Sequence, residues 1–281
     1  MAARLDKELV SRGLAPSRTR AAQLISTGKV TVNGAAVLKP STTVEPRAEI
    51  SVEEPQHWVS RAAHKLIGAL ESFPGVKPAG QRCLDAGAST GGFTQVLLEQ
   101  GAAHVVAADV GHDQLALQLR EHPQVTNHEG INLRYVQPGD LGDPFSLIVA
   151  DLSFISLKLV LAPLARLAAQ QADLLIMVKP QFEIGRERLP RTGVVSSPTQ
   201  RREAVAGVME AAARAGLRVQ GLTRSPLAGQ DGNAEFFLHL RPQSPASSPA
   251  DDRVGEAEEL VAELDAVDFT DSLGTTQVPA R

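Results

Sequence analysis

Cys83-Leu84-Asp85-Ala86-Gly87-Ala88-Ser89-Thr90-Gly91-Gly92-Phe93-Thr94 is the most informative stretch of the chain. It runs from an apolar strand through a glycine-rich turn into a helix, where backbone approaches a ligand closely because glycine has no Cβ atom. Its spacing, G-x-x-x-G-G, is not the G-x-G-x-x-G of dinucleotide-binding turns. The stretch therefore predicts either a cradle for another kind of ligand or a tight turn that binds nothing.

Strands and helices alternate from Arg82 to about Arg241, which indicates a mostly parallel sheet with helices on both faces. The expected strands lie at residues 82–85, 104–109, 125–128, 145–151, 173–179, 217–223 and 235–240. The segment between the last two, 224–233, is too short for a crossover helix, so these strands should pair antiparallel. A parallel sheet that ends in such a hairpin is typical of Rossmann-like methyltransferases, and this is the expected α/β fold class.

Residues 1–57 are expected to form a small α+β domain of their own. Helices at 4–10 and 18–26, the second capped by Ser17, precede two short strands around Asn33-Gly34. A further strand is expected at 49–52. Residues 58–81 are then a linker and leading helix, and residues 82–241 form the second domain.

Charge is distributed unevenly along the chain. The net charge is −4, but residues 1–39 hold seven basic and two acidic residues (+5), and residues 243–281 hold two basic and nine acidic ones (−7). The tail, residues 242–281, opens with a Pro/Ser-rich run and has little apolar surface, so it is expected to be disordered. Leu260, Val261 and Leu264 leave room for one short amphipathic helix within it.

Composition narrows the function classes. The single cysteine, Cys83, lies in an apolar run and should be a buried, inert thiol. No window has the ~18 apolar residues of a membrane-spanning helix, and the N-terminus lacks the apolar core of a secretory signal. The seven histidines show no metal-ligand spacing. A soluble, cytoplasmic protein without a metal is expected, whereas the sequence leaves its oligomeric state open.

The glycine-rich turn, preceded by Asp85, resembles the first motif of S-adenosylmethionine-dependent methyltransferases. Asp109 ends the next strand, 22 residues after Gly87, where such folds place an acid on the ribose hydroxyls of the cofactor. Taken alone, an acid at a strand end is as often a turn former. The expected cofactor-binding residues are Asp85, Gly87, Ala88, Ser89, Thr90, Gly91, Gly92, Asp109 and Asp151.

Three further segments carry a more specific resemblance: Trp58-Val59-Ser60-Arg61 with His64-Lys65-Leu66, Ala150-Asp151-Leu152-Ser153-Phe154-Ile155-Ser156, and Val178-Lys179-Pro180-Gln181-Phe182-Glu183. With the turn, they resemble the TlyA family of haemolysin-like ribosomal RNA methyltransferases over residues 1–241, and the catalytic part is similar to FtsJ-like ribose 2′-O-methyltransferases. The resemblance implies a catalytic tetrad of Lys65, Asp151, Lys179 and Glu235, and methylation of cytidine ribose in ribosomal subunits. The chain departs from the family at Ala62-Ala63, where glycines are commoner.

Such a tetrad makes chemical sense. A ribose 2′-hydroxyl is a poor nucleophile, so its attack on a methyl group needs in-line placement and help with its proton. A lysine can accept that proton where burial or a neighbouring cation lowers its pKa from ~10.4, and Lys179, with Lys65 as that cation, is the candidate base. Asp151 and Glu235 should orient the lysines. The competing interpretation is two ordinary salt bridges, Lys65 with Glu235 and Lys179 with Asp151.

The N-terminal domain resembles the small RNA-binding domain shared by a small-subunit ribosomal protein and several pseudouridine synthases. Its candidate phosphate contacts are Arg4, Lys7, Arg12, Arg18, Arg20 and Lys29. Such contacts position RNA without reading its sequence, and a solvated basic face is the plainer interpretation. Two other functions stay open: a membrane-active haemolysin, although no strongly amphipathic segment is found, and a non-catalytic RNA-binding assembly factor that retains the cofactor fold.

Overall fold

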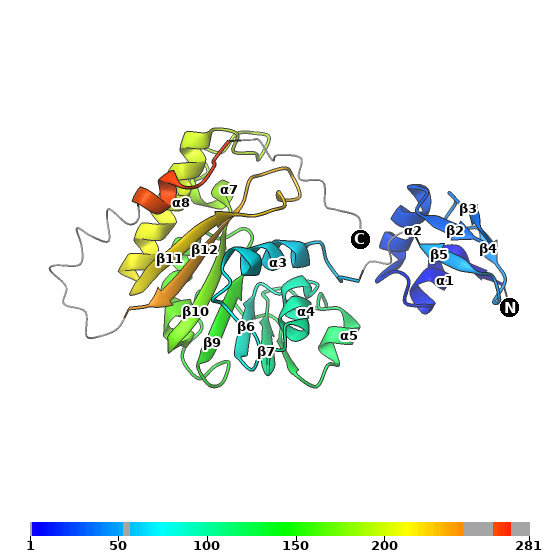
Figure 1. The fold of residues 1–281 in the computed structure, drawn as a ribbon, viewed down its shortest axis with the longest axis horizontal. Helices are drawn as coiled ribbons and strands as arrows, with labels where there is room; N and C mark the ends of the chain where they lie inside the picture. Colours follow the sequence, from blue (N-terminus) through cyan, green and yellow to red (C-terminus); the bar gives the residue numbers. More distant parts are fainter. Residues whose placement is uncertain (1, 53–56, 244–260, 271–281) are drawn as a thin grey trace. The chain divides into compact units, whose positions relative to one another are not determined.

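The computed structural model describes residues 2–52, 57–243 and 261–270, and the chain divides into two compact units between Val59 and Ser60 (Figure 1). Each unit has its own hydrophobic core. None of the helices in the described ranges has the length and apolar content needed to span a bilayer. In the same ranges, no group of His, Cys, Asp or Glu side chains could hold a metal ion.

The N-terminal unit has two helices and a small antiparallel sheet of order β3-β2-β5, as predicted. Asn33 and Gly34 both have positive φ, which a two-residue hairpin between β2 and β3 requires. A second, two-stranded sheet of β1 and β4 was not predicted, because strands of two residues show no alternation. The elements are β1 (Ala3–Arg4), α1 (Leu5–Ser11), α2 (Arg18–Ser26), β2 (Val30–Val32), β3 (Ala35–Ala36), β4 (Thr43–Val44) and β5 (Ile50–Val52).

The second unit is built on a seven-stranded sheet of order β11-β12-β10-β9-β6-β7-β8. Its elements are α3 (Ala62–Ser72), β6 (Arg82–Ala86), α4 (Gly92–Glu99), β7 (His104–Ala108), α5 (Leu117–Arg120), β8 (Val125–His128), β9 (Phe145–Ala150), the 3-10 helix η1 (Leu157–Leu159), α6 (Leu161–Leu167), β10 (Ala168–Val178), α7 (Pro180–Glu183), α8 (Pro198–Arg214), β11 (Leu217–Arg224) and β12 (Phe236–Pro242).

Strand directions confirm the predicted mostly parallel sheet with a terminal hairpin. Five neighbouring strands of the sheet, β10, β9, β6, β7 and β8, are parallel, and β12 runs antiparallel to both β10 and β11. β10 begins at Ala168 rather than near Asp173, with a register shift between these residues. The carboxyl ends of β6, β7, β9 and β10 therefore meet at one edge of the sheet, where ligands bind in open α/β folds.

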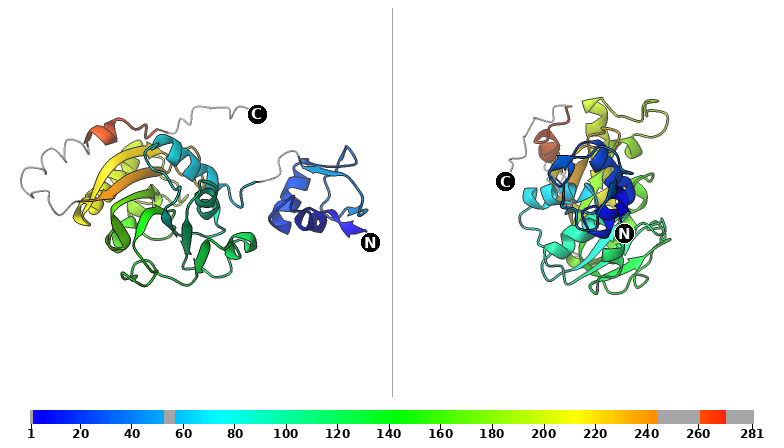
Figure 2. Two further views of the ribbon diagram at one scale, coloured as in Figure 1. Left: turned by 60° about the horizontal axis from the view of Figure 1, so that its bottom comes forward. Right: turned by 90° about the vertical axis from the view of Figure 1, so that its right-hand side faces the viewer.

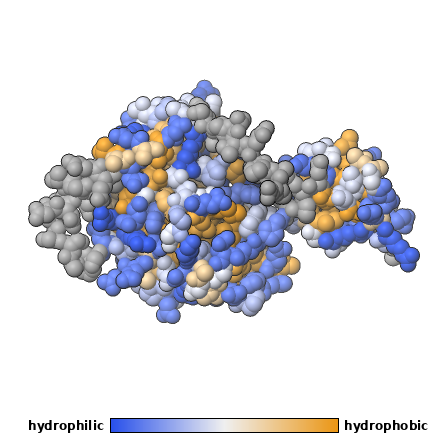
Figure 3. Space-filling model, in the orientation of Figure 1, coloured by the Kyte–Doolittle hydropathy of each residue, from blue (hydrophilic) through white to orange (hydrophobic). Residues whose placement is uncertain are grey.

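Helices cover both faces of the sheet, as Figures 1 and 2 show. On one face Leu174, Ile176 and Val178 of β10 join the core formed with α6 and α8. On the other face, Phe93 of α4 stacks on Phe237 of β12 with ring centroids 6.1 Å apart. Because the central strands are buried on both faces, their sequences read as continuous apolar runs. Outside, polar residues cover most of the face of this unit that Figure 3 shows, around an apolar area near its middle.

Residues 261–270 are ordered within the tail that was expected to be disordered, at the place where the sequence left room for one short helix. Residues 261–265 are helical, and Leu264 and Phe269 are buried in the core beside α8. The Phe269 ring lies 4.9 Å from that of Phe236, and buried Arg201 donates a hydrogen bond to the Phe269 carbonyl oxygen at 2.9 Å. The acidic composition pointed to a solvated chain, but these two apolar side chains are buried in the core of the second unit. The rest of the predicted tail lies outside the described residues, except for residues 242–243.

Candidate active site

The glycine-rich turn joins β6 to α4 at the carboxyl edge of the sheet. Gly87 and Gly91 have φ values of +89° and +97°, which L side chains rarely adopt. A Cβ atom on Gly87 would lie 2.8 Å from the backbone oxygen of Asp151. Glycine at this position therefore lets the turn approach Asp151, the residue directly after β9.

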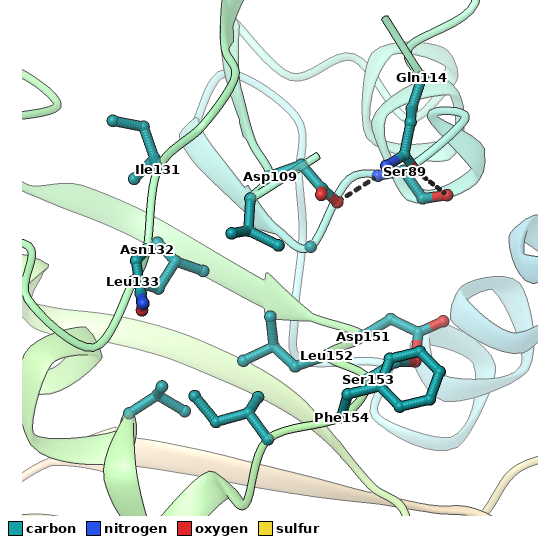
Figure 4. A pocket seen from close by; sticks show the side chains of 14 residues that line it. Ser89, Asp109, Gln114, Ile131, Asn132, Leu133, Asp151, Leu152, Ser153 and Phe154 are labelled. Carbon is teal, nitrogen blue, oxygen red and sulfur yellow. Dashed lines mark hydrogen bonds between the residues drawn. The ribbon is translucent and has the colours of Figure 1, made fainter. Parts of the chain in front are cut away.

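Asp109, just after β7, is hydrogen-bonded to the glycine-rich turn. One carboxylate oxygen accepts a hydrogen bond from the Ser89 N–H at 2.9 Å (Figure 4). The other accepts one from the Gly111 N–H at 2.7 Å. Ser89 itself has a positive φ of 47°. The carboxylate thus fixes the backbone of the turn at the place where a ligand would meet it.

A cavity of about 480 Å³ opens between these segments. Its lining residues are Gly87, Ser89, Asp109, Val110, Gln114, Ile131, Asn132, Leu133, Asp151, Leu152, Ser153, Phe154, Ile155 and Val160. Figure 4 shows Asp109 and Ser89 on one side and the segment from Asp151 to Phe154 on the other. The cavity thus combines a few polar groups with an apolar wall, as small-molecule sites do.

Four of the predicted cofactor-binding residues line this cavity: Gly87, Ser89, Asp109 and Asp151. The others belong to the turn or its surroundings without lining it: Asp85, Ala88, Thr90, Gly91 and Gly92. Sequence reasoning did not select the apolar wall formed by Val110, Ile131 and Leu133. The available signal was their position, because each follows closely on the end of β7 or β8.

Asp85 lies beneath the turn and is fully buried. The Thr94 hydroxyl donates a hydrogen bond to it at 2.7 Å, and its other carboxylate oxygen has no hydrogen-bond partner. Burial raises the pKa of Asp85 to about 7, against the opposing effect of Thr94. The geometry therefore gives Asp85 a supporting position under α4 rather than a place in the cavity wall.

The structure brings the four predicted tetrad residues together from four segments. Lys65 of α3 pairs with Glu235, which directly precedes β12, at 2.5 Å, and Lys179 at the end of β10 pairs with Asp151 at 2.6 Å. Burial raises the pKa of Glu235, while the positive charges of Lys65 and Lys179 oppose that rise. The two ion pairs are thus close enough to act on each other electrostatically.

Ser153 joins this group although sequence reasoning did not select it. The Lys179 Nζ donates a hydrogen bond to the Ser153 hydroxyl at 2.8 Å. Both Lys179 and Lys65 are less than one-tenth exposed. Because Asp151 and Ser153 also line the cavity, the Lys179 amine is held between the cavity and the ion pair of Lys65 with Glu235.

In the N-terminal unit, several predicted RNA-binding residues have internal partners. Arg4 and Arg18 both pair with buried Asp6, at 2.9 and 3.0 Å, and the hydrogen bond from Arg4, more than any other cause, holds the pKa of Asp6 well below its usual range. Arg12 pairs with Glu8 at 2.8 Å and donates to two backbone carbonyls. Arg20 bonds Gln23, whereas Lys7 is exposed. Part of the positive charge therefore stabilises the unit itself.

Comparison with known proteins agrees with this architecture. The family model of FtsJ-like methyltransferases matches residues 58–242, and that of the S4 domain matches residues 3–50. The 16S/23S rRNA (cytidine-2′-O)-methyltransferase TlyA of Mycobacterium tuberculosis is 51% identical over 244 residues, which are 86% of this chain and 91% of the relative. Hemolysin A of Brachyspira hyodysenteriae is 34% identical, over 84% of this chain and 99% of its own length.

A solved structure named as a hemolysin, from Streptococcus thermophilus, has a TM-score of 0.67 and 34% identity, and covers 94% of this chain and 98% of its own. The chain thus has the fold of an FtsJ-like methyltransferase and carries an S4 domain. Within that class, the chain belongs to the TlyA family, as its motifs predicted.

Proposed function

We propose that this protein transfers a methyl group from S-adenosylmethionine to the ribose 2′-hydroxyl of cytidine in ribosomal RNA. The observation that carries the proposal is the double role of Asp151, which lines the cavity and pairs with Lys179. The names of the Mycobacterium relative and of a Campylobacter jejuni relative, a 23S rRNA (cytidine-2′-O)-methyltransferase TlyA that is 32% identical, support the choice of substrate.

The cavity fits the cofactor by size and by chemistry. Its volume of about 480 Å³ is in the range of small-molecule sites. Asp109 offers carboxylate oxygens to ribose hydroxyls, and Val110, Ile131 and Leu133 offer an apolar surface to a purine ring. When bound, the cofactor supplies an electrophilic methyl group on a positively charged sulfur.

In this proposal, Lys179 handles the proton of the ribose hydroxyl. Its Nζ is held by Asp151 and Ser153. After releasing one of its own protons, this amine would take up the hydroxyl proton while the hydroxyl oxygen bonds to the transferred methyl group and the methyl–sulfur bond breaks. The pair of Lys65 and Glu235 fixes the charge and shape of the inner side of the site. Positioning supplies most of the rate gain, and proton transfer contributes about 10²–10⁴-fold.

The S4 unit supplies binding to the phosphate backbone of RNA, and the sequence match over residues 3–50 supports this role. Because its arginines are partly used internally, we expect it to recognise RNA shape and charge rather than base sequence. Ribosomal subunits in the cytoplasm are the proposed partner.

The decisive experiment measures methyl transfer from radiolabelled cofactor to ribosomal subunits that lack the modification, with the methylated nucleotides then mapped. Lys179→Arg should lower turnover by about 10²-fold or more while cofactor binding is retained, because arginine keeps the charge but stays protonated. Lys77→Arg, at an exposed lysine, is the matched control.

Near-normal turnover of Lys179→Arg would reduce this lysine to a structural partner of Asp151. If the unmodified protein transfers no methyl group to any ribosomal particle, a non-catalytic assembly factor becomes the better interpretation. Methylation at a base atom or of another nucleoside would contradict the proposed target.

A further inference from the structure

Glu183, at the end of α7, is a buried carboxylate that the proposed reaction does not use. It is 9% exposed and lies four residues after Lys179. One of its carboxylate oxygens accepts a hydrogen bond from the Ser156 hydroxyl at 2.6 Å, and the other accepts one from the Leu157 N–H at 2.7 Å. Burial raises its pKa, and these two hydrogen bonds oppose the rise.

Glu183 contacts the end of the loop of residues 151–156, which contributes both to the cavity wall and to the contacts of Lys179. Asp151 and Ser153 contact Lys179, and Leu152 to Ile155 belong to the cavity wall. β9 anchors the near end of the loop. At the far end, Ser156 caps η1 by accepting a hydrogen bond from the Lys158 N–H. The hydrogen bonds that Ser156 and Leu157 donate to Glu183 therefore fix the point where η1 begins.

The loop also holds a conformation that needs support. Phe154 has a φ of +64°, which a bulky side chain rarely adopts, and it is 93% exposed. Its ring lies 5.4 Å from that of Phe182, the residue before Glu183. Lys179, Phe182 and Glu183, all at α7 or its start, thus contact the loop at three successive points.

We propose that Glu183 is a positioning residue that fixes the loop 151–156 against α7, so that Asp151 and Ser153 stay on Lys179 and the loop stays in the cavity wall. This inference rests on the proposed roles of Asp151 and Lys179. The role needs a hydrogen-bond acceptor of the right length for Leu157, but it needs no negative charge.

The test compares Glu183→Ala and Glu183→Gln in the full chain. Removing both hydrogen bonds in Glu183→Ala should lower kcat by about 10–100-fold and raise the KM for the cofactor, because small misplacements of reacting groups have effects of this size. Glu183→Gln should stay within about threefold of the unmodified enzyme, since its amide oxygen accepts from Leu157 and its NH₂ donates to Ser156. Glu187→Gln, at an exposed carboxylate nearby, is the control.

Wild-type kcat and KM in folded Glu183→Ala would overturn the proposal. Equal losses in Glu183→Gln and Glu183→Ala would also overturn it, because they would show that the charge or the proton is what matters. If Glu183→Ala does not fold, Ser156→Ala, which loses one of the two hydrogen bonds, decides in its place: a KM or kcat defect supports the proposal and unchanged kinetics reject it. Lys179→Arg, measured alongside, shows separately whether the proposed function holds.

Discussion

At the scale of single residues, two acids near the carboxyl ends of the neighbouring strands β6 and β7, Asp85 and Asp109, lie in opposite surroundings. Asp109 lines the cavity, whereas Asp85 is fully buried and accepts a hydrogen bond from the Thr94 hydroxyl. We expect Asp109→Ala to weaken cofactor binding about tenfold or more, through loss of a ribose partner and of the bond to the Ser89 N–H. Asp85→Asn should leave cofactor affinity within about threefold. Calorimetry measures both, and equal losses would place Asp85 in the site after all.

The buried position of Asp85 has a second consequence, in the pH dependence of stability. An unfolded Asp ionises near pH ~3.9, but burial raises the folded pKa to about 7. Between these values the folded state keeps a proton that the unfolded state releases, so this group makes stability fall as pH rises from ~4 to ~7. The stability gained by Asp85→Asn should therefore grow across this window and level off above it. Urea unfolding at pH 5 and pH 8 measures the difference, and a pH-independent difference would contradict it.

Sequence reasoning selected residues by their place at a strand end, and the structure places three of them at or beside the cavity. It selected Asp109, Asp151 and Lys179 because ligands bind at that edge of an α/β sheet. It also selected Asp85, which is buried and does not line the cavity, since nothing in the pattern separates a side chain under the turn from one beside it. Ser153 and Glu183 stood in motifs that were already singled out, but their partners depend on packing between distant segments.

At the scale of elements, the contact between α3 and the loop before β12 sets how Lys65 meets Glu235. Gly68 lies one turn after Lys65, and a Cβ atom there would be 2.6 Å from the Cγ of Pro226. Gly68→Ala gains up to ~1 kcal/mol in helix propensity, but overpacking costs about 1–3 kcal/mol. We therefore expect lower thermal stability and slower methyl transfer, with most of both restored by adding Pro226→Ala.

Gly75→Ala is the control for that prediction, because no atom lies within 4 Å of its added Cβ. Wild-type activity and melting temperature in Gly68→Ala alone would show that the loop moves aside without cost.

Sequence patterns predicted α3 as a leading helix and every strand of the large sheet, because the periodicity of apolar residues and apolar runs are local signals. They could not predict this contact, which joins segments about 160 residues apart in the chain.

At the scale of the whole molecule, the two units should divide the work. Deleting residues 1–57 should leave cofactor binding intact, since the cavity lies within the second unit, while methylation of ribosomes is lost. Binding of the full chain to ribosomal subunits should weaken steeply as salt rises. Calorimetry and filter binding measure the two. Normal ribosome methylation by the shortened chain, or binding that ignores salt, would contradict an RNA-binding role for the S4 unit.

The segment 261–270 should stabilise the second unit mainly through its apolar contacts. The ion pair of Arg202 with Asp265 is at 2.6 Å, but the two side chains are 43% and 64% exposed, and exposed pairs contribute about 0–1 kcal/mol. Phe269 is buried against Phe236, so Phe269→Ala should cost about 3–4 kcal/mol, the lower part of the range for buried aromatic residues. Val261→Ala, at a half-exposed position, should change little.

Because the expected loss in Phe269→Ala is hydrophobic, it should be as large in 1 M salt as in dilute buffer, whereas an electrostatic attachment would weaken as charges are screened. Chemical unfolding of each variant at both salt concentrations separates the two cases. Asp265→Asn should have a small effect that salt removes. If Asp265→Asn proved as costly as Phe269→Ala, the acidic residues rather than Leu264 and Phe269 would hold the segment on α8.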